Sequence, residues 1–331
     1  MNGLVLTLTA KYYLANPKSF LSHLWILSET NQRNYSTTVH TIFFTGANQS
    51  VALAKAGANV YHAGKIGREA IWIREYMASL GVDVSHVAVS ENEITGRAII
   101  QLSTSTHDNA IVLVPGTNHT ITPAYARAVL EDFGSGDWIV QQNEISSGGD
   151  IMRIAAEKGL SICFNPAPLT PSLHSTFPLH LVNILILNEG EARSLHSQHT
   201  STTASPKAIA RALLDLYPLM RGVVVTLGGE GLVALFRGPS GATMDFELPS
   251  EKVHVQDTTA AGDCFTGYLL GSLIRDVFPK TAAHTEDEAY FIAVHRALRE
   301  ANVAASLAVE RHGAMESIPL ASEVRERLER S

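Results

Sequence analysis

Short apolar runs alternate with helical patterns along most of this chain, and the alternation limits the folds open to it. The runs that suit strands buried on both faces are residues 138–140, 160–164, 184–187 and 223–226. Helical stretches over residues 151–157 and 208–217 separate them. Strands and helices in this order form βαβ units, in which helices cover a parallel sheet. The pattern therefore predicts an α/β fold with a mainly parallel central sheet.

A different pattern interrupts the alternation between residues 94 and 117. Two strand-like runs, 98–102 and 110–114, are joined by a polar stretch with no helix between them. This arrangement predicts a β-hairpin, which could serve as a small lid. A simple antiparallel edge of the main sheet is the alternative.

Composition argues against several classes of function. The chain has 331 residues, 45% apolar and 17% charged, so it can bury a large core. Its net charge is −7 and its basic residues are scattered, which argues against nucleic-acid binding. The two cysteines favour a reducing compartment, and we expect the cytoplasm, with the nucleus as an alternative. The apolar run at residues 4–8 is far too short to span a membrane.

The stretch DTTAAGDCF at residues 257–265 carries the strongest chemical signal. The spacing of Phe265, Leu269 and Leu273 predicts a helix that begins just before Asp263. The free amides and the dipole at such a helix start favour an anion such as phosphate. A carboxylate beside that anion can accept a hydroxyl proton as the oxygen attacks phosphorus. A simple capping role for Asp263 is the alternative.

Polar residues also follow the buried strand 184–187, in the stretch NEGE at residues 188–191. Ligands of α/β sheets bind at the carboxyl ends of strands. Asn188 and Glu191 are three residues apart, so one helical turn can bring them together. Their oxygen atoms suit Mg²⁺ that is held largely through water and nucleotide phosphate. A capped helix start is the alternative.

Further polar groups stand at other strand ends. The glycine-rich turn TLGGEG at residues 226–231 could border a nucleotide, or it could be a plain hairpin turn. The stretch GANQ at residues 46–49 opens a helix, and Asn48 offers a donor and an acceptor for sugar hydroxyls. Glu144 and the stretch NPAP at residues 165–168 follow two more strands. The chain lacks the motifs G-x-x-x-x-G-K-[ST], H-E-x-x-H and G-x-S-x-G.

Taken in order, these motifs resemble the ribokinase family, also called the phosphofructokinase-B-type carbohydrate kinases, over about residues 46–319. Residues 257–263 are similar to the family signature D-T-x-[GA]-A-G-D, and residues 46–49 to the end of its G-G-K-G-A-N-Q segment. Within the family, the ribokinase branch is the most similar. The resemblance implies a three-layer α/β/α sandwich with a small β lid. It also implies ATP-dependent phosphorylation of D-ribose to D-ribose 5-phosphate.

The resemblance implies a role for each matched position. Asp263 would be the catalytic base, beside an anion hole formed by the backbone at Ala260, Ala261 and Gly262. The sugar-binding residues would be Gly46, Asn48, Glu144 and Asp263. The ATP-binding residues would be Asn188, Thr226, Leu227, Gly228, Gly229, Glu230, Gly231, Gly262 and Asn302. Glu191 would organise Mg²⁺ indirectly, and an activating K⁺ would be bound by Asp257, Thr259, Ala308, Arg311, Gly313 and Ser317.

The start of the chain departs from the family pattern. Phe43-Phe44-Thr45 stands where the family has Gly-Gly-Lys, and no Asn-x-Asp triplet occurs between Met1 and Thr41. We therefore expect residues 1–42 to be an atypical, disordered or incomplete lid and first-strand region, and residues 43–331 to form the kinase domain. In the family, the lid often mediates dimerisation. We expect a homodimer weaker than usual, or a monomer.

The sequence leaves three functions open. The first is an active kinase for D-ribose. The second is a kinase of the same fold for another sugar or a nucleoside, because pocket residues rather than the fold decide the substrate. The third is a catalytically impaired protein that still binds ATP or sugar, because part of the sugar-binding segment is altered.

Overall fold

A central sheet organises the protein, for which a computed structural model describes residues 4–8, 45–102, 109–197, 204–279 and 284–330. Within these residues the sheet has nine strands, in the order β11-β10-β9-β8-β7-β6-β1-β2-β3. In this order, every pair of adjacent strands between β9 and β3 is parallel. At the other edge, β10 pairs antiparallel with both β9 and β11. The strands are β1 (Leu4–Leu8), β2 (Asn59–Gly67), β3 (Val87–Ser90), β6 (Trp138–Gln142), β7 (Ser161–Asn165), β8 (Ile184–Asn188), β9 (Gly222–Thr226), β10 (Leu232–Arg237) and β11 (Thr243–Leu248).

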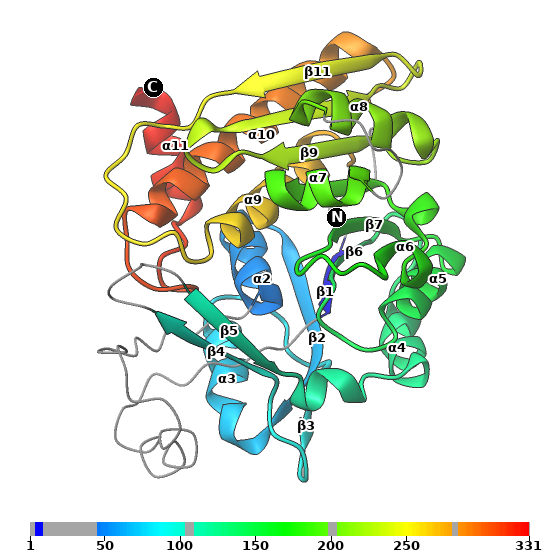
Figure 1. Ribbon diagram of the computed structural model, residues 1–331, viewed down its shortest axis with the longest axis vertical. Helices are drawn as coiled ribbons and strands as arrows, with labels where there is room; N and C mark the ends of the chain where they lie inside the picture. Colours follow the sequence, from blue (N-terminus) through cyan, green and yellow to red (C-terminus); the bar gives the residue numbers. More distant parts are fainter. Residues whose placement is uncertain (1–3, 9–44, 103–108, 198–203, 280–283, 331) are drawn as a thin grey trace.

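Helices cover both faces of the sheet (Figure 1). One layer contains α2 (Thr45–Lys55), α3 (Ile71–Ser79), α9 (Ala261–Asp276), α10 (Asp287–Val309) and α11 (Ala321–Arg330). The opposite layer contains α4 (Pro123–Val129), α5 (Gly148–Glu157), the short α6 (Leu173–Thr176), α7 (Glu189–Ser197) and α8 (Pro206–Leu216). The prediction of a mainly parallel sheet in an α/β/α sandwich is therefore confirmed.

The strands are apolar because both of their faces are buried. Val140 and Cys163 belong to the core beneath α2 and α9, whereas Ile139 and Phe164 belong to the core beneath α5. Successive side chains of a strand point to opposite faces of the sheet. A strand between two helical layers therefore needs apolar residues at every position, which explains the continuous runs in the sequence.

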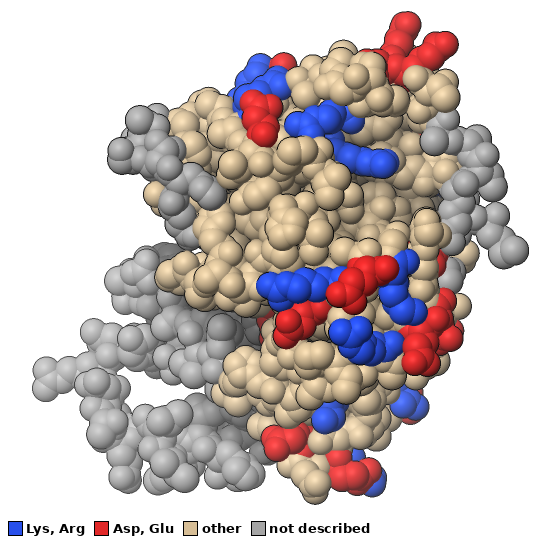
Figure 2. Space-filling view, turned by 90° about the vertical axis from the view of Figure 1, so that its right-hand side faces the viewer, with Lys and Arg blue, Asp and Glu red and all other residues tan. Residues whose placement is uncertain are grey.

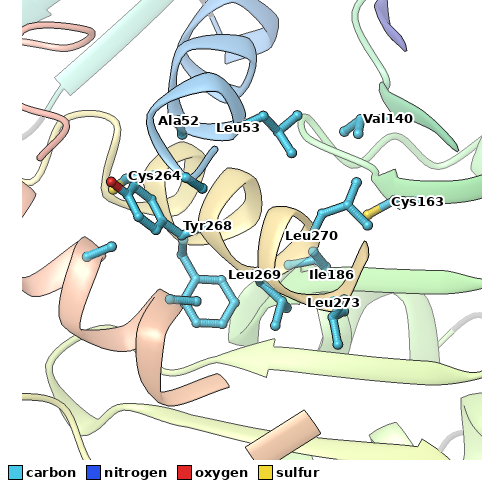
Figure 3. Close-up of a cluster of buried hydrophobic side chains, with 14 of the residues drawn as sticks. Ala52, Leu53, Val140, Cys163, Ile186, Cys264, Tyr268, Leu269, Leu270 and Leu273 are labelled. Atoms are coloured by element: carbon cyan, nitrogen blue, oxygen red, sulfur yellow. The ribbon is translucent and has the colours of Figure 1, made fainter. Parts of the chain in front are cut away.

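Close packing of α2 against α9 fixes the geometry on which the candidate site depends. A Cβ atom added to Gly267 of α9 would lie 2.4 Å from the Cβ of Ala52 and 2.9 Å from the carbonyl oxygen of Gln49. Glycine at this position therefore lets the two helices approach more closely than any side chain would allow. Figure 3 shows Ala52 and Leu53 of α2 beside α9.

The hairpin predicted between residues 94 and 117 is present. β4 (Arg97–Leu102) and β5 (Asn109–Val114) pair antiparallel as a separate two-stranded sheet. The alternative, an antiparallel edge of the main sheet, is therefore wrong. The hairpin's roles as a lid and as a dimer contact stay predictions.

Strand β1 was missed by the sequence reasoning. It lies inside the main sheet between β2 and β6, so residues near the start of the chain contribute to the central layer. Residues 9–44, which include Phe43 and Phe44, lie outside the described residues. The division of the chain at residue 42 therefore stays a prediction.

The distribution of surface charge and the state of the two cysteines can be compared with the expectations from composition. Basic and acidic side chains are interspersed on the face drawn in Figure 2. Cys163 and Cys264 are both buried and free. In the part of the chain that the structure describes, no helix combines the length and apolarity that a membrane crossing requires.

Candidate active site

Polar side chains meet where the parallel strands end. Gln142 of β6 pairs in register with Asn165 of β7, and Asn188 of β8 pairs with Thr226 of β9. Phe164 of β7 pairs with Leu185 of β8, so the second pair lies two residues beyond the first, and both pairs stand at the edge of the sheet formed by the carboxyl ends of the strands. This is the edge at which open α/β sheets bind ligands.

Asp263, in the first turn of α9, lies at this edge with its carboxylate turned toward α2. Asn48 Nδ2 donates a hydrogen bond to Asp263 Oδ2 at 2.8 Å, and Gln49 Nε2 donates to Oδ1 at 3.0 Å. The carboxylate is therefore bound by side chains of another helix, and the alternative of a simple helix cap is not supported.

The electrostatic environment of Asp263 brings the pKa of its carboxyl close to neutral pH. Burial raises the pKa of Asp263 to about 7, against the opposing effect of the hydrogen bonds from Asn48 and Gln49. The nearby carboxylate of Glu144 raises the pKa further. General bases work best when their pKa lies near the working pH.

The start of α9 is open to a ligand. Its N-cap residue, Ala260, has a left-handed backbone with φ of 58° and makes no side-chain capping hydrogen bond. The first amides of a helix have no partner within the helix. A Cβ atom added to Gly262 would meet no protein atom within 4 Å. The amide of Ala261 donates to the Thr258 carbonyl at 3.3 Å, whereas the backbone at Gly262 faces open space, which is compatible with the predicted anion hole.

Two adjoining cavities share this helix start. The smaller, of about 210 Å³, is bordered by Asp263, Asn188 and Glu191. The larger, of about 740 Å³, is bordered by the glycine turn and Asn302. Both are also lined by Thr226, Thr258, Ala261 and Gly262. The helix start thus separates a compartment of nucleotide size from the compartment that contains Asp263.

Asn188 and Glu191 meet as predicted. Glu191 N donates to Asn188 Oδ1 at 2.8 Å, and Asn188 N donates to a Glu191 carboxylate oxygen at 2.9 Å. This reciprocal pair is a capping box, so the helix-cap alternative describes their local role. Burial raises the pKa of Glu191. Both side chains also border the smaller cavity, so the capped turn is compatible with indirect binding of Mg²⁺.

The glycine turn joins β9 to β10 as an antiparallel hairpin. Gly231 has φ of 102°, and a Cβ atom there would lie 2.0 Å from the carbonyl oxygen of Leu248, so only glycine fits. Thr226, Gly228, Gly229 and Gly231 line the larger cavity, whereas Leu227 and Glu230 are absent from its described lining. The turn is thus both a hairpin turn and a cavity wall.

The residues predicted to bind K⁺ come from two loops that meet. Asp257 accepts hydrogen bonds from the amides of Thr259 at 2.9 Å and Gly313 at 3.1 Å. Burial opposes ionisation of Asp257, but hydrogen bonds from the side chain and amide of Thr259 and from the amide of Gly313 prevail, together with nearby His312, and lower its pKa. The Ala308 carbonyl accepts from the Arg311 amide, and Ser317 lies buried farther along the same loop. Carboxylate and carbonyl oxygens in this region fit a hard monovalent cation.

The remaining predicted residues lie around α2. Glu144 accepts a hydrogen bond from Thr45 Oγ1 at 3.2 Å. Thr45 stands at the position of the family lysine and also lines the smaller cavity. Gly46 is buried in the first turn of α2, where its carbonyl accepts from Ser50, and it borders neither cavity among the described residues.

Sequence reasoning missed the role of Gln49, although the residue belongs to the GANQ stretch quoted for the family resemblance. Its contact with Asp263 joins residues 214 positions apart in the chain. The sequence did contain one indication of this contact, which is the pair of adjacent amide side chains, Asn48 and Gln49, near the start of the helix.

We predict that Gly262→Ala lowers the turnover rate without unfolding the protein. The added methyl group meets no protein atom within 4 Å, so it would project into the open space at the helix start that borders both cavities. Alanine in a helix is also favoured over glycine by about 0.5–1 kcal/mol. Steady-state kinetics and thermal unfolding check this prediction. Unchanged kinetics would contradict a ligand at this backbone position.

Comparisons with known proteins agree with this geometry. The profile of the pfkB family carbohydrate kinases matches residues 45–321. The chain is 31% identical to a ribokinase of Haemophilus influenzae over 288 residues, which are 86% of each chain. It is also 31% identical to a ribokinase of Bacillus subtilis over 314 residues, or 92% of this chain and 95% of that relative.

The fold is similar to that of solved ribokinases. The structure of a ribokinase from Cryptococcus neoformans in complex with ADP has a TM-score of 0.73 and 27% identity, and the match covers 98% of this chain and 99% of that chain. The family profile spans most of the chain and includes the α2 start, the strand-end residues and the α9 start. The protein therefore belongs to the pfkB family of carbohydrate kinases and is a ribokinase-type sugar kinase.

Proposed function

We propose that this protein transfers the γ-phosphoryl group of ATP to the 5-hydroxyl of D-ribose, with Asp263 as the general base. The position of Asp263 at the helix start shared by both cavities is the observation that carries this proposal. The larger cavity has the size for a nucleotide, and the related Cryptococcus neoformans ribokinase was solved with ADP. The curated relatives described above are named ribokinases, which supports ribose as the sugar.

In the proposed reaction, the carboxylate of Asp263 takes the proton of the sugar hydroxyl as that oxygen forms a bond to the γ-phosphorus. The bond between this phosphorus and its bridging oxygen breaks, and ADP leaves. Charge that develops on the transferred group is stabilised by the backbone amides at the start of α9. Asn48 would help to hold the sugar, because its buried Oδ1 has no hydrogen-bond partner within the described residues.

Mg²⁺ and K⁺ belong to the proposal as bound ions. Mg²⁺ would neutralise nucleotide phosphate charge, with Glu191 and Asn188 orienting it through water. The loop of Asp257 and Thr259 would bind K⁺ together with the loop that contains Gly313. Thr258 and Ala260 belong to the same stretch as Asp257 and Thr259, and both line the smaller cavity. A cation that fixes this stretch would therefore also fix the backbone of the proposed anion hole.

Replacing K⁺ with a bulky organic monovalent cation is expected to lower kcat severalfold at saturating Mg²⁺ and ATP. The physical reason is that Asp257 would lose a counter-charge that helps to keep its loop fixed beneath the anion hole. A coupled ADP-release assay at constant ionic strength checks this. Equal kcat in both salts would exclude activation by K⁺, without contradicting the proposed phosphoryl transfer.

The proposed base predicts the pH dependence. Because burial raises the pKa of Asp263 to about 7, the carboxyl gains a proton as the pH falls through neutrality. A protonated carboxyl cannot accept the hydroxyl proton, so kcat/KM for the sugar should fall about tenfold per pH unit below that value. A profile that stays flat from about pH 8 to about pH 5 would exclude Asp263 as the base.

A panel of substrates tests the function itself. ADP release is measured with D-ribose, other pentoses and hexoses, and nucleosides. We expect D-ribose to give the highest kcat/KM. Preference for a nucleoside or another sugar would support the kinase activity and exclude D-ribose as the preferred substrate. ATP binding without turnover on any acceptor would favour the catalytically impaired relative.

A further inference from the structure

Gln49 connects the proposed base to the edge of the sheet. Its Nε2 donates to Asp263 Oδ1 at 3.0 Å and to Asn165 Oδ1 at 3.1 Å. Its Oε1 accepts a hydrogen bond from Gln142 Nε2. Gln49 and Gln142 are fully buried. One amide group therefore links α2, α9 and the ends of β6 and β7.

The donors and acceptors around Gln49 allow only one orientation of its amide. Asn165 Nδ2 donates to the carbonyl of Ile186 at 3.0 Å, so Asn165 presents its oxygen to Gln49. A flipped Gln49 would place Oε1 against two acceptors, Asn165 Oδ1 and the Asp263 carboxylate. Gln142 follows Gln49 rather than fixing it, because Gln142 Oε1 has no hydrogen-bond partner among the described residues. The network thus keeps the N–H of Gln49 directed at Asp263.

We infer that Gln49 is a positioning residue, which holds the Asp263 carboxylate in the orientation from which it accepts the sugar proton. This inference rests on the proposed kinase function. The two amide contacts engage one oxygen each, from Gln49 on Oδ1 and from Asn48 on Oδ2, so the plane of the carboxylate is fixed. Each oxygen keeps a lone pair that can receive a substrate proton.

The hydrogen bond from Gln49 also favours the ionised form of the base. It opposes the burial that raises the pKa of Asp263. Other ionisable groups face the same carboxyl: Glu144 from the loop after β6, Glu191 across the smaller cavity, and the buried thiol of Cys264. Substitution of Gln49 leaves these groups in place, so a change in titration can be assigned to the lost hydrogen bond.

Gln49→Leu removes the donor at nearly constant volume. We expect kcat to fall at least tenfold and the acid limb of kcat/KM to move up by about one pH unit, while ATP affinity stays within twofold. Gln49→Glu places a second carboxyl against Asp263, and the two would share a proton. Its acid limb should therefore move up further than that of Gln49→Leu.

Ser50→Ala is the matched control. Ser50 is the next residue of α2 and is equally buried, but its hydroxyl contacts the Gly46 carbonyl and His62, whereas the side chains bonded to Asp263 are Asn48 and Gln49. This variant should keep the wild-type acid limb. Should Gln49→Leu fail to fold, the isosteric Gln49→Glu provides the test.

A titration that needs no turnover separates this inference from the kinase function. The Asp263 carboxyl is followed by ¹³C NMR in nucleotide-free protein, with its signal assigned by its loss in Asp263→Asn. An upward shift of its titration in the Gln49 variants supports the inference even if no sugar is phosphorylated. Unshifted titration in the folded variants, together with wild-type kcat, would overturn it while leaving the kinase proposal intact.

Discussion

Asp263→Asn is expected to lower kcat by about 10²–10⁴-fold, the usual contribution of a general base, while ATP affinity changes little. The carboxylate lies in the smaller cavity with Asn48, Gln49 and Glu144 near it, whereas the nucleotide would occupy the larger cavity. An amide cannot remove a hydroxyl proton at neutral pH. Steady-state kinetics and calorimetric titration with ATP measure the two quantities separately.

The hydrogen bonds around Asp263 call for a second variant as a control. Asn48 and Gln49 both donate to the carboxylate, so the NH₂ group of an asparagine would face one of these donors. Asp263→Ala avoids that opposition and should show the same loss of kcat. Turnover close to that of the wild type in both variants would exclude Asp263 as the base.

Gly267→Ala is expected to reduce both stability and turnover, although residue 267 lies outside the cavities. The new methyl group would lie 2.4 Å from Ala52 Cβ, 2.8 Å from Leu53 N and 2.9 Å from Gln49 O. The contacts with backbone atoms cannot be relieved by rotating a side chain, so α2 must move. Overpacking of this kind costs about 1–3 kcal/mol, and a displacement of about 1 Å in a catalytic group can cost about 10²-fold in rate.

Gly271→Ala provides the matched control on the same helix face. Its methyl group would meet Ala56 Cβ at 3.0 Å and the next atoms only at 3.9 Å, so a small shift accommodates it. We expect a much smaller loss of stability, and kcat near the wild-type value. Denaturant unfolding and coupled kinetics on both variants check this. Equal effects of the two substitutions would show that close approach at Gly267 is not what positions Asp263.

The sequence predicts the parts of this protein that local patterns determine. The buried strands from β6 to β9, the helix that begins at the anion-hole motif and the polar strand ends all appear where the patterns indicated. Each depends on hydrophobic periodicity or on turn residues within about ten neighbouring positions. The placement of Asn188 beside Thr226 then follows from parallel register alone.

Other features depend on contacts between distant segments, which no local pattern encodes. β1 has only five residues, and so short an apolar run does not show which strands it will join, so its place between β2 and β6 is decided by the sheet. The partners of Gln49 are set by the crossing of α2 over α9, which Gly267 permits. A glycine within a helix does not reveal in the sequence which helix will approach it.

The role of Asp263 can be seen in a structure of the protein with D-ribose and a non-hydrolysable ATP analogue. We expect the 5-hydroxyl of the sugar within hydrogen-bond distance of an Asp263 carboxylate oxygen, with the γ-phosphate at the amides of Ala261 and Gly262. A sugar hydroxyl that points away from Asp263, or a nucleotide whose phosphates lie far from the start of α9, would contradict it.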